Sequence, residues 1–161
     1  MRNENNVQKV VEYLKNRRAN AEIPHFKHKV VSATMASEVP GFPFFPLNRI
    51  VKTLIVTADK KPYAVMVGGD KKLDYGKLRK QLKCKKVRLA QRSEVKEITG
   101  FDVGEVCSLS YTLEKIPKIM DEEIVNKDIV LTGGGSQYTL VKIKAKDLLK
   151  VLSPIIANIS K

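Results

Sequence analysis

The chain has 161 residues and carries 30 Lys and Arg against 17 Asp and Glu, a formal net charge of +13. Its length suits one domain, and a hydrophobic content of 43% is enough for a buried core, which excludes a disordered chain. No apolar run reaches the roughly 18 residues of a membrane span. The polar N-terminus does not resemble a signal peptide. We therefore expect a cytoplasmic protein without membrane contact, and a chain this basic is expected to bind a polyanion.

The first elements are predicted from apolar spacing and capping residues. Apolar residues at i, i+3, i+4 and i+7 predict an amphipathic helix over about 5–18. An extended segment follows at 21–31, and Ser32 is expected to cap a short helix. Three prolines and three phenylalanines at 40–46 predict a stiff loop. This loop either folds over the core or forms a pocket wall beside Lys52.

The rest of the chain alternates between strands and helices. In chain order, the predicted elements are a strand at 48–56, its hairpin partner at 63–69, a helix at 70–82, a strand at 85–90, a helix at 94–99 capped by Ser93 and ended by Gly100, two strands around the glycines at 133–135, and a closing helix at 145–156. This order predicts one α/β domain over 1–161 with a mixed sheet, not a doubly wound one.

Lys52 stands alone in an apolar strand. Side chains alternate across a strand, so Lys52 shares a face with Ile50, Leu54 and Val56. Burying an ammonium there is costly without a partner. The strand alone leaves two alternatives open: Lys52 extends its head to the edge of the sheet, or it lines a cleft and binds an anion or polarises a carbonyl.

Basic residues cluster between Lys71 and Arg88, where nine Lys and Arg accompany a single acid, Asp74. On the predicted helix, the basic side chains lie off the apolar face and form a positive ridge. Such a ridge is either a solvated face or a surface for phosphate backbone. We favour nucleic acid, with contacts that position the ligand without reading its sequence.

The other candidate motifs favour ordinary structural roles. His25 and His28 have no third ligand cluster nearby in the sequence, so we expect no metal and no cofactor. Cys84 and Cys107 are far apart and are predicted to be reduced thiols. Cys107 is a nucleophile candidate, but a small buried thiol is the commoner case. The stretch "TGGGSQ" at 132–137 lacks the Lys-Ser/Thr of a P-loop and predicts a tight turn or a close backbone approach.

Four stretches together resemble a known family. They are "IVKTLIV", "GDKKLDYGKLRKQLKCKKVRLAQRSEVKEITGFDVGEV", "IPKIMDEEIV" and "LTGGGSQYTLVKIKAKDLL". Their order and spacing over about 26–152 resemble the YbaK/prolyl-tRNA synthetase-associated editing-domain family of trans-acting aminoacyl-tRNA deacylases. The resemblance implies an α+β domain with a mixed, mostly antiparallel sheet or partial barrel flanked by helices.

The resemblance also implies a site. Lys52 matches the family's essential pocket lysine and is the expected catalytic residue. Residues 104–108 match a Gly-x-x-x-Pro loop whose backbone N–H groups bind the ester carbonyl, but Ser108 stands where the family has proline. The substrate-binding residues implied are Thr53, Gly104, Val106, Cys107, Ser108, Asp121, Gly133 and Gly134.

The implied function is hydrolysis of the ester bond of mischarged aminoacyl-tRNA. An aminoacyl ester is already activated, so positioning and oxyanion binding suffice. The tRNA is expected to bind along Lys77, Arg79, Lys80 and Lys83, and an aminoacyl-tRNA synthetase is a second candidate partner. Because Ser108 is small and polar, we expect Ala, Ser or Cys esters to be accepted. The alternatives are a catalytically silent tRNA-binding or synthetase-associated module, which the Ser108 departure favours, and a hydrolase or binder of small nucleotides.

Overall fold

The structure is a computed structural model that describes residues 4–161, so residues 1–3 of the predicted domain lie outside the described part. Its elements are α1 (Glu4–Asn16), β1 (Ala21–Glu22), α2 (Ala33–Ser37), η1 (Leu47–Arg49), β2 (Val51–Ala58), β3 (Lys61–Gly68), α3 (Tyr75–Leu82), β4 (Val87–Leu89), α4 (Arg92–Thr99), η2 (Tyr111–Leu113), β5 (Lys118–Asp121), α5 (Glu122–Val125), β6 (Ile129–Gly133), β7 (Leu140–Lys144), α6 (Ala145–Leu152) and β8 (Ile155–Ala157).

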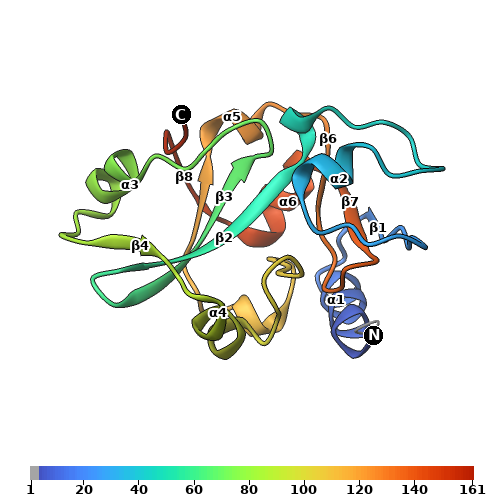
Figure 1. Cartoon of the computed structure of the whole chain (residues 1–161), viewed down its shortest axis with the longest axis horizontal. Helices are drawn as coiled ribbons and strands as arrows, with labels where there is room; N and C mark the ends of the chain where they lie inside the picture. The colour runs from blue at the N-terminus through green and yellow to red at the C-terminus, as the bar shows by residue number, and fades with distance from the viewer. Residues whose placement is uncertain (1–3) are drawn as a thin grey trace.

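The strands form two sheets. A five-stranded sheet has the order β4-β2-β3-β5-β8, and a three-stranded sheet has the order β1-β7-β6. The β2–β3 hairpin and the β2–β4 pair are antiparallel, whereas β5 runs parallel to both β3 and β8. The predicted mixed α/β domain is confirmed, in the form of open sheets and not a closed barrel. Helix α3 lies at one end of the larger sheet and α1 near the other sheet (Figure 1).

Strand β2 separates two parts of the core. Val51 and Ile55 point into the main cluster, which also contains buried residues of α1, α4 and α6. Val56 points to the other face, into a cluster with Leu73 and Leu78 beneath α3. By alternation Lys52 belongs to this second face. The position of Lys52 in the β2–β3 hairpin therefore determines the face of the sheet on which its side chain lies.

Several local predictions are confirmed. The Ser32 Oγ accepts a hydrogen bond from Met35 N at 3.1 Å and caps α2. Gly100 ends α4 with a φ of 78°, a left-handed conformation that glycine adopts without steric cost.

Several predicted helix boundaries are wrong. The helix predicted at 70–82 begins at Tyr75 with Asp74 as its cap, and the first helix ends at Asn16, not near 18. Helix α4 begins at Arg92, with Gln91 as the capping residue, so Ser93 lies inside the helix. Here the Glu94 side chain accepts a hydrogen bond from Gln91 N at 2.8 Å and fixes the start. The closing helix ends at Leu152, not 156, because Pro154 cannot continue a helix. The residues after it form β8 instead.

The loop at 40–46 folds over the core, the first of the two alternatives. Phe42 packs edge-on against Phe26 at 5.2 Å between ring centroids and stacks on Phe45 at 5.9 Å. Phe45 is buried, while Phe44 is 68% exposed. These rings close a small cluster above β6 and β7.

Across residues 4–161, no helix combines the length and the apolar character that crossing a membrane requires.

Candidate functional site

A cavity of about 340 Å³ opens beside β2 and has a mostly apolar lining. It is bounded by the edge of β2, the end of β6, the loop after α4, and the segment that leads into α2. The lining residues are Val30, Val31, Ser32, Ala33, Ala36, Ile50, Val51, Lys52, Thr53, Leu54, Ile55, Leu89, Ala90, Val95, Val103, Gly104, Val106, Thr132, Gly133, Thr139 and Leu140.

The cavity exists because two strands diverge from the same edge of β2. Strand β4 pairs with β2 only at 56–58, and β6 meets it through the parallel bridge between Ile50 and Leu131. Among the described strands, none pairs with this edge at Thr53. Ala90 N donates to Ile55 O at 2.9 Å, so the odd-numbered backbone groups face this edge. The backbone N–H and C=O of Thr53 therefore point toward the cavity.

Lys52 lines the cavity and is half-buried. Its Nζ donates a hydrogen bond to the backbone oxygen of Lys71 at 2.6 Å. Burial lowers the pKa of Lys52, the Asp70 carboxylate opposes this shift, and Lys72 reinforces it. The ammonium is thus held in one orientation, against a carbonyl of the segment after β3 that does not belong to the cavity lining.

Two threonines of the cavity wall have hydroxyls without a partner within the described part of the chain. Thr53 Oγ1 and Thr132 Oγ1 are buried and form no hydrogen bond within the described part of the chain. Both residues contribute to the lining. A buried unpaired hydroxyl costs about 1–3 kcal/mol. These two groups are therefore polar atoms just behind the cavity surface whose hydrogen-bonding capacity the described chain leaves unused.

Glycines let the backbone approach closely at this site. A Cβ on Gly133 would lie 2.4 Å from the backbone oxygen of Val106, so any side chain would push the loop after α4 away from β6. Gly104 has a φ of +92°, and its ideal Cβ position is 3.6 Å from the Val31 side chain. The structure thus brings Gly104, Val106 and Gly133 together with Lys52 and Thr53.

Four predicted site residues lie outside this lining: Cys107, Ser108, Asp121 and Gly134. Cys107 is fully buried in the main core, and burial raises the pKa of its thiol to about 12, which disfavours the nucleophilic thiolate. Ser108 is also fully buried. Its side chain does not line the cavity, so the expected preference for Ala, Ser or Cys esters needs a basis other than Ser108. Gly134 packs against the backbone of Thr139 within the glycine hairpin.

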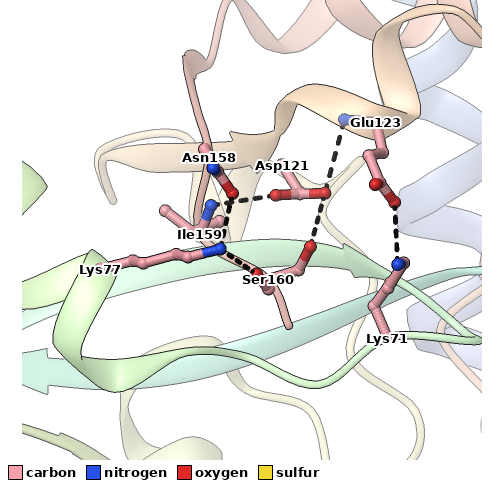
Figure 2. A network of polar contacts seen from close by, with 7 residues as sticks. All are labelled: Lys71, Lys77, Asp121, Glu123, Asn158, Ile159 and Ser160. Atoms are coloured by element: carbon pink, nitrogen blue, oxygen red, sulfur yellow. Dashed lines mark hydrogen bonds and ion pairs between the residues drawn. The ribbon is translucent and has the colours of Figure 1, made fainter.

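Asp121 lies at the end of β5 and is completely buried. Its Oδ1 accepts a hydrogen bond from Ile159 N at 3.0 Å, and its Oδ2 accepts bonds from Ser160 Oγ at 3.0 Å and Glu123 N at 3.4 Å (Figure 2). These bonds attach the C-terminal residues to β5. They account for the aspartate without a substrate contact.

The predicted ridge is only partly free. Lys77 Nζ donates to Asn158 Oδ1 at 3.1 Å and to Ser160 O at 2.7 Å, so it is held by the C-terminal segment (Figure 2). Arg79, Lys80 and Lys83 are exposed.

The fold adds lysines that the sequence prediction of the ridge did not include. The Asp59 carboxylate accepts hydrogen bonds from Lys85 N at 3.1 Å and Lys86 N at 2.9 Å, which joins the β2–β3 turn to the start of β4. Exposed Lys60 and Lys61 thereby lie near Lys85 and Lys86, which follow the ridge in the chain. The sequence "DKKP" indicates the turn that carries Lys60 and Lys61, but it does not indicate that the start of β4 lies beside this turn. We call Lys60, Lys61, Arg79, Lys80, Lys83, Lys85 and Lys86 the basic end.

Thr132 was also missed as a site residue. A threonine in a strand is ordinary, and only the lack of a partner within the described part of the folded chain distinguishes it. For metal binding, residues 4–161 contain no group of three or more His, Cys, Asp or Glu side chains placed to hold an ion.

The fold and the cavity define an aminoacyl-tRNA editing domain of the YbaK type. The family profile described as the aminoacyl-tRNA editing domain matches residues 30–151. The chain belongs to this family.

Relatives and solved structures agree with this membership. The proline–tRNA ligase of Maridesulfovibrio salexigens is 30% identical over 124 residues, which are 76% of this chain and 21% of that protein. That of Syntrophus aciditrophicus is 31% identical over 110 residues, or 68% and 19%. The chain thus spans about a fifth of the length of these curated relatives.

Two solved structures cover almost the whole chain. The hypothetical protein APE2540 is 28% identical with a TM-score of 0.84, over 95% of this chain and 99% of that one. A candidate trans-editing enzyme for prolyl tRNA synthetase is 25% identical with a TM-score of 0.86, over 97% of both chains.

Proposed function

We propose that the chain hydrolyses the ester bond of mischarged aminoacyl-tRNA, and that residues 1–161 act as one editing domain in trans, in the cytoplasm. The observation that carries this proposal is the cavity, where a half-buried lysine meets an unpaired strand edge and a close glycine loop. The near full-length likeness to a candidate trans-editing enzyme supports it.

The chemistry requires little beyond positioning. Water attacks the ester carbonyl carbon, the bond to the ribose oxygen breaks, and that oxygen takes up a proton to restore the hydroxyl. Negative charge develops on the carbonyl oxygen during the attack, and preorganised N–H donors stabilise it. The backbone N–H groups of Gly104, Val106 and Thr53 are the donors that we assign to this oxygen, because the N–H of Glu105 already donates to Asp102 O at 3.0 Å. The neighbouring ribose hydroxyl assists, as in the mechanism that the family resemblance implies.

Lys52 is the catalytic residue that we assign. Its ammonium adds a half-buried positive charge on the strand that borders the cavity, where charge interactions are stronger than in water. The bond to the Lys71 oxygen fixes its direction in advance, so the lysine needs no reorganisation during the reaction. Either the developing oxyanion or the adjacent phosphate of the tRNA end is its partner.

The unpaired hydroxyls bear on the choice of amino acid. An apolar cavity distinguishes one methylene by only about 1–3 kcal/mol, whereas polar groups that stay unpaired discriminate more strongly. We assign Thr53 and Thr132, in place of Ser108, as the hydroxyls that meet the aminoacyl group. Esters of Ala, Ser and Cys remain the first substrates to test.

The proposed partner is tRNA, bound through the basic end. The exposed lysines there come from two separate segments, the β2–β3 turn and the stretch from α3 to the start of β4. The Asp59 carboxylate joins these segments by accepting backbone N–H bonds from Lys85 and Lys86, not by pairing with a lysine side chain. An aminoacyl-tRNA synthetase is a second proposed partner, supported by the relatives that are proline–tRNA ligases.

One observation favours a second function. Ser108 occupies the position of the family's loop proline, and its Oγ has no partner within the described chain. A looser loop would leave a tRNA-binding module without hydrolysis. A deacylation assay with a panel of mischarged tRNAs, comparing the parent with Lys52→Ala and with the surface control Lys146→Ala, separates the two functions. Binding without ester hydrolysis on every substrate would establish the silent module.

A further inference from the structure

We propose that Asp121 and the C-terminal residues 158–161 are positioning residues for Lys52. None of them belongs to the cavity lining, yet a continuous set of hydrogen bonds connects them to the carbonyl that holds the lysine. The inference rests on the proposed function only in taking Lys52 as the catalytic group.

The first step is the attachment of the C-terminal segment to β5. The buried Asp121 carboxyl group bonds both the backbone of Ile159 and the hydroxyl of Ser160 (Figure 2). Its third bond, from Glu123 N, also makes it the capping residue of α5. One side chain therefore fixes the C-terminal segment and the start of α5 at the same time.

The second step joins the C-terminal segment to the residues before α3. Lys72 and Lys161 exchange backbone hydrogen bonds at 3.0 and 2.9 Å, with Leu73 opposite Ser160 in an antiparallel bridge. Asp74 N donates to Ile159 O at 2.8 Å. The segment thus lies between β5 and 72–74 like a short additional strand.

The third step reaches Lys52. Lys71 directly precedes the bridged residues, and its carbonyl oxygen accepts the 2.6 Å bond from Lys52 Nζ. The Lys71 side chain forms an ion pair with Glu123 at 3.7 Å (Figure 2). Lys71 is therefore restrained twice: its side chain pairs with Glu123, and the next residue bonds the C-terminal segment. Asp121 bonds both Glu123 and that segment.

Lys77 braces the same segment from α3. Its ammonium contacts the side chain of Asn158 and the backbone oxygen of Ser160 (Figure 2). Helix α3, the end of β5 and residues 72–74 thus all bond to residues 158–161. Because hydrogen bonds to a charged group are the strong ones, this arrangement gives the loop that holds Lys52 a defined position.

The decisive variant is Ser160→Ala, which removes one bond to Asp121 and leaves the backbone bond of Ile159 in place. Its matched control is Ser110→Ala, because Ser110 is also buried and accepts a backbone bond from Thr112, but it caps η2 on another part of the molecule. The pKa of Lys52 is measured without tRNA, from the carbon-13 shift of its Cε in lysine-labelled protein. Deacylation kinetics are measured in parallel.

We expect Ser160→Ala to raise the pKa of Lys52 toward its ordinary value, since a looser loop admits water and relieves the burial that lowers it. We expect kcat to fall about tenfold with KM nearly unchanged, because the loss of a group acting in the transition state lowers kcat. Ser110→Ala should leave both quantities at parental values. Ser160→Thr, which keeps a hydroxyl, should restore them.

An unchanged Lys52 pKa and an unchanged kcat in Ser160→Ala would overturn the inference and leave the network a structural one. If Ser160→Ala does not fold, Lys77→Gln replaces it, because Lys77 is only half-buried and its loss removes two bonds to the same segment. The pKa readout does not depend on hydrolysis. Failure of the proposed function, seen as full activity in Lys52→Ala, is therefore distinct from failure of the positioning.

Discussion

The Nζ of Lys52 lies 2.6 Å from the backbone oxygen of Lys71, 19 residues later in the chain. Lys52 is near the start of β2, and Lys71 follows the end of β3. The β2–β3 hairpin brings these two residues together, since Val51 is opposite Gly68 in the register. The lysine therefore has a fixed direction that neither strand alone would give it.

Removing the Lys52 charge tests its role directly. We expect Lys52→Ala to fold normally and to lose about 100-fold or more in kcat, the usual effect of removing a key electrostatic group. Lys52→Met keeps most of the side-chain volume without the charge and should lose as much. Single-turnover deacylation measures both variants. Near-parental rates in either variant would remove Lys52 from the mechanism.

The sequence was sufficient for the elements that are set locally. Apolar periodicity located the β2–β3 hairpin, and the capping role of Ser32 needs only three residues of context. Two elements were missed for different reasons. The start of α4 is a local capping box between Gln91 and Glu94, which Ser93 hid because serine is the commoner cap. Strand β8 pairs with β5, a contact that no local pattern indicates.

The Glu94 pair makes a prediction about pH. Hydrogen bonds from Arg88 and Gln91 N lower the pKa of Glu94 to about 2 from an ordinary 4.5. A carboxyl group whose pKa is lower in the folded than in the unfolded protein stabilises the fold at pH values above the unfolded pKa. That stabilisation is lost as the pH falls toward the folded pKa. The difference in unfolding free energy between the parent and Glu94→Gln should therefore shrink as the pH falls from about 4.5 to about 2. Urea unfolding at several pH values measures it, and a difference independent of pH would contradict the assigned pair.

The two cavity threonines make a prediction in which stability and function change in opposite directions. Thr132→Val removes a buried hydroxyl that has no partner within the described residues, so we expect unchanged or higher stability, by up to about 1–3 kcal/mol. Its matched control is Thr139→Val, since Thr139 also lines the cavity but bonds Ser136 and the Gly134 oxygen. That variant should be destabilised.

If the Thr132 hydroxyl meets the substrate, Thr132→Val will change the ranking of Ala, Ser and Cys esters in the deacylation assay while the protein remains stable. A parental ranking with a gain in stability would mean that this hydroxyl does not contact the aminoacyl group. Denaturant unfolding and the substrate panel together separate these outcomes.

The same comparison explains why the site was only partly predictable. Ser108 and Thr132 are both small hydroxyl residues next to a predicted loop, and no local pattern distinguishes them. Tertiary packing turns Ser108 into the core and places Thr132 in the cavity. Lys52, Thr53, Gly104, Val106 and Gly133 were assembled from three separate segments by the family resemblance. Asp121 was expected at the same site, but its three bonds are to the chain itself.

The close contact at Gly133 predicts a sensitive backbone position. In Gly133→Ala the new methyl group would lie 2.4 Å from the Val106 oxygen, so the loop after α4 must move. We expect a loss of about 1–3 kcal/mol in unfolding free energy, typical of overpacking, together with reduced deacylation. Gly76→Ala in α3 is the control, where the nearest atom is the Asp74 side chain at 3.3 Å and alanine favours the helix. Equal stability of the two variants would contradict the tight approach.

The basic end predicts how tRNA binding depends on salt. The slope of log K against log salt concentration should become shallower by about 0.7–0.9 for every phosphate that the variant protein no longer neutralises. The sequence placed the contacts on α3 alone, but Lys77 is held by Asn158 and Ser160, so its neutralisation should change the slope little. We expect the larger effect from Lys80→Gln and Lys83→Gln combined with Lys60→Gln and Lys61→Gln.

The control for this experiment is the pair Lys146→Gln and Lys150→Gln on α6, which removes exposed charge from another face. Filter binding of uncharged tRNA between low and moderate salt measures the slope without any hydrolysis. If the α6 pair reduces the slope as much per lysine removed as the four basic-end substitutions do, the attraction is a property of total charge and the acceptor stem has no defined track there. A reduction confined to the basic end would place the tRNA backbone along the β2–β3 turn and α3. The tRNA end that carries the amino acid would then be directed to the cavity at the other end of β2.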